Sequence, residues 1–350
     1  MSEIKMDLPI VSVIMSAYNE NTIVSRAIES VLQQSYPNFE LIIVDDCSTD
    51  STLSILKSYQ KKDPRIVVLC NSTNLGLTSS LIKGVSASRG RLITRIDADD
   101  FYHVDKIKRQ VDLYNMNPLV RWNVVLSGEV APDCTLLGIQ STDISNMNPS
   151  TIMEHMRTTE NAFYHGAVMF EKSLYEQAGG YRPSFDGAED FDLWLRFMEI
   201  SEFGIIPEVL YYRETRETGI SVKSAIKQAI VASGAIKCTR HRLNKLPEVD
   251  EIRTMQQTVV AKNDINTVIN YIGLNRCWYL GCKIFPYNPS VSYPFIKASL
   301  SEKLRWRAVV KLGLAKLPIG ITRLAVNTYR YGVKHTFVSF LFRHKMKERK

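Results

Sequence analysis

The sequence predicts an α/β fold: a mostly parallel central sheet with flanking helices, followed by a helical and basic C-terminal appendage. Two observations predict it. Short apolar, β-prone runs alternate with segments of helical periodicity over the first 220 residues, and 45% of the 350 residues are hydrophobic. Strands buried on both faces of a parallel sheet form such near-continuous apolar runs. The length allows one substantial core and a smaller second part.

The elements are expected in a regular order. Each of the first four strands precedes a segment with apolar residues at helical spacing, and these strands cover 11–15, 39–44, 65–69 and 91–96. Later strands are expected at 167–170, at 203–212 and at two stretches within 122–142 that a turn around Pro132-Asp133 joins. Later helices are expected at 107–116, 150–160, 190–198, 222–240 and from Ser173, as N-cap, to Gly179-Gly180.

An acidic cluster follows the fourth strand. Asp97, Asp99 and Asp100 come directly after an apolar run, and unpaired carboxylates are costly inside a sheet. The cluster therefore belongs at the C-terminal end of the strand, where ligands of open α/β sheets bind. An Asp-x-Asp there can help to hold Mg²⁺ or Mn²⁺ on a nucleotide, because the phosphates supply further oxygen ligands. The alternative is a solvated turn in which Asp100 caps the next helix.

Two more predicted strands end in polar residues. Tyr18-Asn19 follows the first strand, and Asp45-Asp46 ends the second. A parallel sheet brings these ends to one edge, together with Asp97 and Asp99. One nucleotide could therefore contact all three strand ends.

Charge and cysteine usage limit the class of protein. Residues 301–350 hold 13 Lys and Arg against two Glu, a net charge of +11, whereas the rest of the chain is −3. The six cysteines form no CxxC pair, so neither a zinc site nor a disulfide framework is indicated. No apolar run reaches the length of a membrane span, and residues 1–9 have no apolar core of signal-peptide length. We expect a cytoplasmic protein with reduced thiols.

Five motifs in this order carry a family resemblance: VSVIMSAYN at 11–19, VDDCSTD at 44–50, NLGL at 74–77, RIDADD at 95–100 and AEDFDLWLR at 188–196. Over roughly residues 9–222 the chain resembles the family 2 inverting glycosyltransferases, which are nucleotide-diphosphosugar enzymes with the GT-A fold. It is most similar to bacterial enzymes of O-antigen, lipooligosaccharide and capsule synthesis. The implied organisation is an N-terminal extension at 1–9, a GT-A domain at 10–222 and a helical region at 223–350.

The resemblance implies roles for residues at the donor side. Asp45 is implied to accept a hydrogen bond from the uracil imide, which would favour UDP; the alternative is an Asx turn or cap. Asp97 is implied to face ribose and sugar, and Asp99, with Asp97, to bind Mn²⁺ or Mg²⁺. The other implied donor contacts are Ser16, Ala17, Tyr18, Asn19, Asn74, Gly76 and Arg95. For Tyr18 the alternative is a core position, and for Arg95 an ion pair that supports the site.

The resemblance also implies an inverting mechanism. Asp190 is the candidate general base for the acceptor hydroxyl, with Glu189 as second choice. The alternative is negative charge placed favourably at a helix N-terminus. The donor would be a UDP-sugar, and the acceptor a saccharide or an undecaprenyl-diphosphate-linked saccharide. The donated sugar and the linkage are not predicted.

The chain departs from the family pattern at two places. Relatives carry a His within a Tyr-Arg-x-His-like sequence, but Tyr212-Arg213-Glu214-Thr215-Arg216 has none. Arg216 could replace it beside the diphosphate, since guanidinium pairs with phosphate oxygens. His165, with Trp194, is expected to line the acceptor pocket; a structural histidine is the alternative.

Beyond residue 301, Trp and Phe interleave with Lys and Arg. Such segments fit peripheral binding to the anionic inner membrane surface, and a solvated helical appendage is the alternative. No nucleic-acid motif is present. Two other functions remain open: a sugar nucleotidyltransferase, although 16–20 lacks a Gly-rich basic loop, and a catalytically silent carbohydrate- or membrane-binding protein.

Overall fold

The computed structural model describes residues 11–117, 119–131, 133–139, 144, 147–214, 222–273, 276, 277, 280, 284 and 289–299. The chain divides into two compact units. The first comprises Met1–Glu217 with Thr239–Lys245, and the second Thr218–Cys238 with Leu246–Lys350. The domain boundary expected at residue 222 stays a prediction. Arg216 and the basic tail lie outside the described residues.

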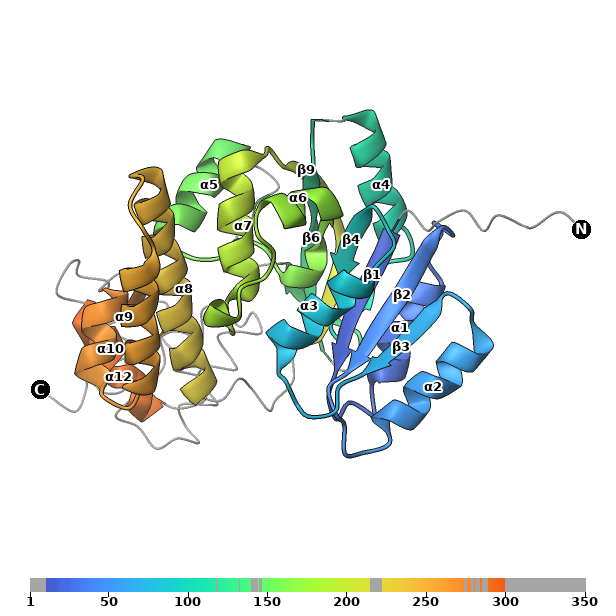
Figure 1. The fold of residues 1–350 in the computed structure, drawn as a ribbon, viewed down its shortest axis with the longest axis horizontal. Coiled ribbons are helices and arrows are strands. Elements are labelled where there is room, and N and C mark those ends of the chain that lie inside the picture. The colour runs from blue at the N-terminus through green and yellow to red at the C-terminus, as the bar shows by residue number, and fades with distance from the viewer. Residues whose placement is uncertain are drawn as a thin grey trace, which may run out of the picture. The chain divides into compact units, whose positions relative to one another are not determined.

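The N-terminal half of the sheet is parallel, as predicted. The strands β1 (Val11–Ala17), β2 (Phe39–Asp45), β3 (Ile66–Cys70) and β4 (Leu92–Arg95) lie in the order β3-β2-β1-β4 (Figure 1). The helices α1 (Val24–Leu32), α2 (Thr52–Lys62) and α3 (Leu77–Ala87) connect them. Gly84 of α3 packs against Ile14, where an added Cβ would lie 2.6 Å from a side-chain carbon. The helix can therefore approach β1 closely.

The other half of the sheet is mixed. β8 (Val168–Glu171) runs antiparallel to β4 and to β6 (Trp122–Val130), and β9 (Gly204–Glu214) runs parallel to β6. Two short strands, β5 (Phe101–Tyr102) and β7 (Leu136–Ile139), pair antiparallel with β9 and β6. Parallel pairing therefore holds throughout the first half and between β6 and β9, whereas the other pairs are antiparallel. The strand–helix alternation that produces parallel crossovers ends after β4, and a turn joins β6 to β7.

The helices of the second half lie where the sequence predicted them, but one predicted N-cap is wrong. They are α4 (Lys106–Met116), α5 (Pro149–Thr158), α6 (Lys172–Gln177) and α7 (Glu189–Ile200), with 3₁₀ turns at His165–Ala167 and Pro183–Phe185. The expected Ser173 cap is wrong: α6 begins at Lys172, and the Ser173 hydroxyl donates to Glu171 Oε2 at 3.1 Å. Asn148 caps α5 by accepting from Thr151 N at 2.8 Å.

An aromatic core seats α7 on the sheet. The rings of Trp122 (β6) and Trp194 (α7) stack at 5.7 Å, and Phe170 and Phe197 contact Trp194. All four side chains are buried, and full burial of such a side chain contributes about 1.5–3 kcal/mol. This packing fixes the first turn of α7 relative to β8.

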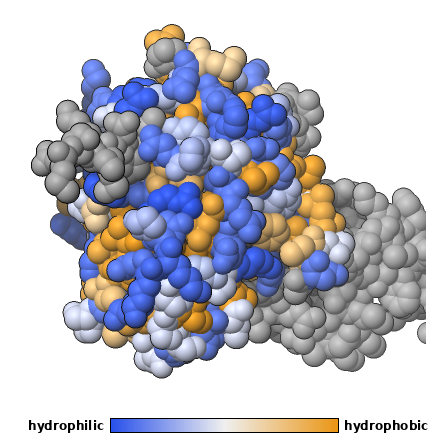
Figure 2. Space-filling view, turned by 90° about the vertical axis from the view of Figure 1, so that its right-hand side faces the viewer, coloured by the Kyte–Doolittle hydropathy of each residue, from blue (hydrophilic) through white to orange (hydrophobic). Residues whose placement is uncertain are grey.

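The second unit is helical, which confirms the predicted C-terminal helical region. Its helices are α8 (Val222–Leu243, whose last turn belongs to the first unit), α9 (Val249–Val260), α10 (Ile265–Ile272) and α12 (Pro289–Ser299). Tyr271 of α10 donates to Glu251 of α9 at 2.7 Å. Among the described helices, none is both long and apolar enough for a bilayer crossing. Figure 2 shows one face of the molecule, on which hydrophilic and hydrophobic residues are interspersed, as is ordinary for protein surfaces.

Candidate active site

The polar ends of β1, β2 and β4 meet at one edge of the sheet, as predicted. Ala17 is paired with Asp45, and Ile14 with Arg95. The next backbone contacts continue this alignment: Asp46 N donates to Ala17 O at 2.9 Å, and Ile96 N donates to Ile14 O at 3.0 Å. The edge therefore carries the residues expected to contact a nucleotide.

The loop after β1 is joined to the loop after β2. Asn19 has a positive φ of 56°, and its Oδ1 accepts from Thr49 N at 2.8 Å. Its backbone N–H donates to Ser48 Oγ at 3.1 Å. The Tyr18 side chain is 45% exposed, so the alternative core position is wrong. Ser16 is half-buried, and Ala17 is buried in the sheet.

The two carboxylates that end β2 have different environments. The Asp46 carboxylate accepts three hydrogen bonds, from Asn71 Nδ2 at 2.7 Å, from Leu75 N at 2.9 Å and from Gly76 N at 2.8 Å. It thereby holds the loop that contains exposed Asn74 and Gly76, whose φ is +83°. Asp45 is buried; its Oδ2 accepts from Ser48 N at 3.2 Å. Its Oδ1 has no partner among the described residues, which is costly unless a ligand donates to it.

Asp97 and Asp99 remain half-buried, whereas Asp100 belongs to the core. Asp100 accepts from Tyr211 Oη and from Glu214 N, the latter at 3.2 Å. The alternative that Asp100 caps the next helix is therefore wrong; α4 begins six residues later, after Asp105. The Asp99 carbonyl accepts from Arg26 Nη2 at 2.8 Å, which fixes the turn.

The electrostatics of this turn fit a cation. Burial, with the charge of Asp99, raises the pKa of Asp97, although Arg95 opposes the shift. Burial and the charges of Asp97 and Asp99 raise the pKa of Asp100 well above its usual range. A divalent cation would relieve this repulsion. Among the described residues no three His, Cys, Asp or Glu side chains converge as a metal cluster. Asp97 and Asp99 supply two half-buried carboxylates, the number that a nucleotide-bound cation takes from a protein.

The first turn of α7 contains three acidic residues, of which Glu189 and Asp190 are the candidate bases. Glu189 is buried, and its Oε2 accepts from Gly187 N at 3.0 Å. Asp190 is half-buried; its Oδ2 accepts from Asn161 Nδ2 at 3.0 Å and its Oδ1 from Phe191 N at 2.7 Å. Burial and the charge of Glu189 raise the pKa of Asp190 to about 7. A carboxyl with that pKa is suited to proton transfer near neutral pH.

Arg95 connects the strand edge with α7. Its guanidinium pairs with Asp97 and contacts His165 Nδ1, which lies 3.8 Å from Glu189 Oε1. The His165 side chain is 5% exposed, and Trp194 is fully buried in the aromatic core. Both side chains are therefore buried, and their expected role in an acceptor pocket stays a prediction. For Arg95, the alternative of a supporting ion pair is what the structure contains.

Comparison with known proteins identifies the family. Residues 12–177 match the family model described as glycosyl transferase family 2. The chain is 37% identical to EpsE of Bacillus subtilis, named as a glycosyltransferase, over 207 residues that make up 58% of this chain and 72% of EpsE. The chain belongs to glycosyl transferase family 2. This family 2 chain is also 41% identical over 104 residues to TuaG of B. subtilis, named for teichuronic acid biosynthesis, but that match spans 30% of this chain and 41% of TuaG.

Solved structures support the GT-A fold of this family 2 member. The crystal structure of Staphylococcus aureus TarS 1-349 aligns with 92% of this chain and 91% of that chain, at a TM-score of 0.54 and 18% identity. The mannosyltransferase PcManGT of Pyrobaculum calidifontis, in complex with GDP-Man and Mn²⁺, aligns with 93% of this chain and 88% of that chain at a TM-score of 0.53 and 16% identity. At these identities the likeness concerns the fold alone.

Two residues of the family 2 site were not predicted. Asn161 reaches Asp190 from the segment after α5, and Tyr181 reaches His165 Nε2 at 2.6 Å. An isolated Asn before Ala-Phe carries no local signal. The Gly179-Gly180 pair before Tyr181 indicated a helix end, but nothing local indicates where the ring points.

Proposed function

We propose that this chain is an inverting glycosyltransferase that moves a hexosyl group from a UDP-sugar to a saccharide or lipid-linked saccharide in bacterial surface polysaccharide synthesis. One observation carries the proposal: Arg95 pairs with Asp97 at the strand edge that also holds Asp45, and it reaches through His165 toward Glu189 in the first turn of α7, next to Asp190. Three relatives support the polysaccharide context, TuaG and two proteins named as chondroitin synthases.

For the donor base, Asp45 and Tyr18 are the proposed contacts. The unpartnered Oδ1 of Asp45 supports acceptance of a hydrogen bond from an imide N–H. The exposed ring of Tyr18 supports stacking on the base. Complexes of the structural neighbour TarS hold UDP and UDP-GlcNAc, whereas PcManGT holds GDP-Man. We propose UDP because a carboxylate oxygen matches the uracil donor.

Asp99 and Asp97 are the proposed ligands of Mn²⁺ or Mg²⁺. Their half-buried position supports this role, because a nucleotide-bound cation needs access to one or two carboxylates only. When bound, the cation would neutralise charge on the leaving diphosphate. Arg26 holds the turn at Asp99, and Asp46 holds the loop at Leu75 and Gly76.

Asp190 is the proposed general base. Asn161 and Phe191 N hold its carboxylate in a defined orientation, and its pKa of about 7 supports both acceptance and later release of a proton. Attack in line with the departing diphosphate inverts the configuration, so an α-linked donor gives a β-linked product. Glu189, whose side chain is buried and bonded to the backbone, is the second choice.

The remaining assignments are proposals as well. We propose a GT-A domain at 10–222, an extension at 1–9 and a helical region at 223–350 whose basic part, from about 301, binds an anionic inner membrane surface. The proposed location is the cytoplasmic face of that membrane. Arg216 is the proposed additional contact to the diphosphate.

The test is a panel of UDP-glucose, UDP-galactose, UDP-GlcNAc, UDP-GalNAc and GDP-mannose, each with Mn²⁺, Mg²⁺ or EDTA, scored for nucleotide release and then for transfer to undecaprenyl-diphosphate-linked saccharides. We expect metal-dependent release of UDP from at least one donor. Binding of UDP without turnover of any donor would favour the catalytically silent alternative, and pyrophosphate release from UTP and a sugar phosphate would favour the nucleotidyltransferase.

A further inference from the structure

Arg95 occupies a buried position between two groups of carboxylates. Its guanidinium pairs with Asp97 on the strand edge, and the side chain is 8% exposed. Burial by itself would lower the pKa of Arg95, but the charges of Asp97 and Glu189 outweigh it and raise this pKa. The same cation therefore faces both the proposed donor side and the proposed base. Because a long Arg side chain loses much rotamer freedom when it is held in one orientation, a further contact besides Asp97 and Glu189 is needed to fix it.

His165 supplies that contact. Arg95 Nη1 lies against His165 Nδ1, and a guanidinium can only donate. Nδ1 must then carry the lone pair, and the ring proton must be on Nε2, which lies 2.6 Å from Tyr181 Oη. Burial and the adjacent Arg95 lower the pKa of His165 well below its usual range, so the neutral ring is stable. The edge of Trp194, at a centroid distance of 5.5 Å, fixes the ring plane.

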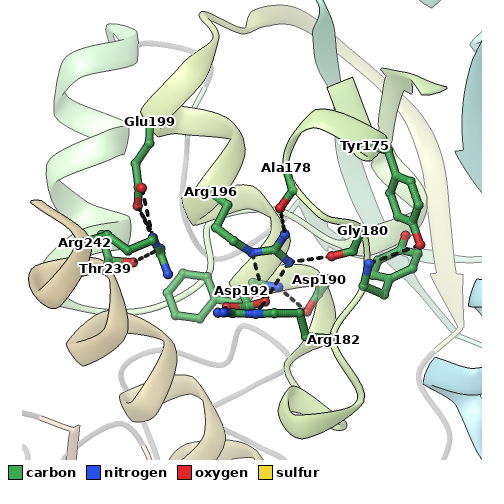
Figure 3. Close-up of polar contacts among 12 residues, drawn as sticks. Tyr175, Ala178, Gly180, Arg182, Asp190, Asp192, Arg196, Glu199, Thr239 and Arg242 are labelled. Atoms are coloured by element: carbon green, nitrogen blue, oxygen red, sulfur yellow. Dashed lines mark hydrogen bonds and ion pairs between the residues drawn. The ribbon is translucent and has the colours of Figure 1, made fainter. Parts of the chain in front are cut away.

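Tyr181 is in turn held by α7. Arg196 donates to the carbonyls of Ala178 and Gly180 (the latter at 2.7 Å), and it pairs with buried Asp192 at 2.7 Å. Figure 3 shows Arg196 reaching from α7 to these carbonyls, with Tyr175 beside the same loop. Tyr181 N donates to Tyr175 Oη at 3.1 Å. The loop is thus tied to the helix that presents Asp190.

We infer that His165 is a positioning residue, which uses its Nδ1 lone pair to hold Arg95 between Asp97 and Glu189. This inference rests on the proposed function and names a buried residue that acts through Arg95. Tyr181 fixes the tautomer by accepting from Nε2. Loss of the lone pair would release Arg95 toward Asp97 and disturb both the donor side and the carboxylate pair.

A matched pair of substitutions separates the two ring nitrogens. The amide oxygen of Asn lies near the position of Nδ1, and the amide of Gln near that of Nε2. We expect His165→Asn to keep the rate of UDP release from the four UDP-sugars, with Mn²⁺ and without acceptor, within a few-fold of the native rate. His165→Gln should lower kcat about 10²-fold, the loss typical of a misplaced site, with a smaller change in KM. His103→Asn, at a side chain that is 42% exposed, is the control.

Two results with the matched pair would overturn the inference. Equal kcat values for His165→Asn and His165→Gln would exclude a special role of Nδ1, and unchanged hydrolysis with a raised KM for acceptor would make His165 an acceptor contact. Arg95→Lys should cost as much as His165→Gln, and the double variant no more than either, because both act through one contact. Additive losses would contradict this.

NMR can test the tautomer of His165 directly, even if the protein turns over no donor. We expect ¹⁵N shifts of a protonated Nε2 and an unprotonated Nδ1 for His165 in the native chain, assigned by comparison with His165→Asn. A protonated Nδ1 would overturn the inference. A native chain that binds no UDP and releases none from any donor would instead contradict the proposed function.

Discussion

The loops after β1 and β2 and the side of the site that carries α7, here called the α7 half, hold their polar groups by different means. In the two loops, backbone N–H groups and neutral side chains make the hydrogen bonds: Asp46 accepts from Leu75 and Gly76, and Asn19 accepts from Thr49. On the α7 half, buried ions do so: Arg196 and Arg182 surround Asp192, and Arg95, which comes from the end of β4, stands beside Glu189. The first arrangement leaves oxygens and a ring available for a nucleotide. The second holds charged groups in a dry environment, where small displacements change pKa values.

The largest expected effect is on the α7 half. Asp190→Asn removes the proposed base and should lower turnover about 10³-fold while leaving UDP affinity nearly unchanged, since the proposed contacts to the base of UDP come from Asp45 and Tyr18 and not from α7. Rates and calorimetric UDP binding measure the two effects. Asp112→Asn, on the outer face of α4 in an exposed pair with Lys108, is the control. Retained turnover would remove Asp190 from the mechanism.

At the end of β4 we expect the reverse: a substitution there should weaken UDP binding, whereas Asp190→Asn should lower turnover. Asp99→Asn should weaken the Mn²⁺-dependent part of UDP binding about 10²-fold, because one of two proposed ligand carboxylates loses its charge. Calorimetry with UDP in Mn²⁺ and in EDTA measures it. If manganese enhances UDP binding equally in the native and Asp99→Asn chains, the metal does not bind there.

The buried ions should dominate stability. Asp192→Asn leaves Arg182 and Arg196 without their carboxylate and should reduce the free energy of unfolding by about 3 kcal/mol. Glu199→Gln affects a more exposed pair with Arg242 (Figure 3), and should cost about 1 kcal/mol or less. Urea denaturation of both variants compares them. Equal losses would mean that burial does not distinguish the two pairs.

A moderate effect is expected at the base-binding loop. Tyr18→Ala should weaken UDP binding by about 1 kcal/mol, roughly fivefold, as stacking on one base contributes. Tyr18→Phe keeps the ring and should bind as the native chain does. Because Tyr18 is exposed, neither change should alter the unfolding midpoint. Equal affinity of all three chains for UDP would exclude stacking.

The smallest effect concerns pH. Asp190 must be ionised to act as a base, and its pKa is about 7, so kcat should fall as pH decreases through that value. Glu189→Gln removes a charge that raises this pKa, and the acidic limb should then move to lower pH. The pair titrates together, so the profile of kcat between pH 5 and 9 is the measurement. A shift to higher pH would contradict the assigned proximity of these carboxylates.

The parallel half of the sheet and its polar edge were predictable from sequence because their signals are local. A short apolar run such as Phe39–Val44, bounded by Pro37 and by two Asp residues, is typical of a buried strand, and the carboxylates that follow it mark the end of that strand. Parallel pairing then brings Asp45 and Asp97 to the same edge without knowledge of any side-chain contact. Asp190 was singled out through the family resemblance of the motif at 188–196 and not through a local signal.

Only the tertiary structure decided the surroundings of α7. His165 and Trp194 were expected at an acceptor, yet both are buried in the structure. A helix cap was the alternative for Asp100, yet Asp100 is buried and accepts a hydrogen bond from Tyr211. The partners come from strands distant in sequence and paired antiparallel, so no periodicity in one segment records them. The position of a buried ion or ring depends on side chains from several distant segments, which the local sequence does not reveal. The position of a strand end, in contrast, depends on the residues of that strand.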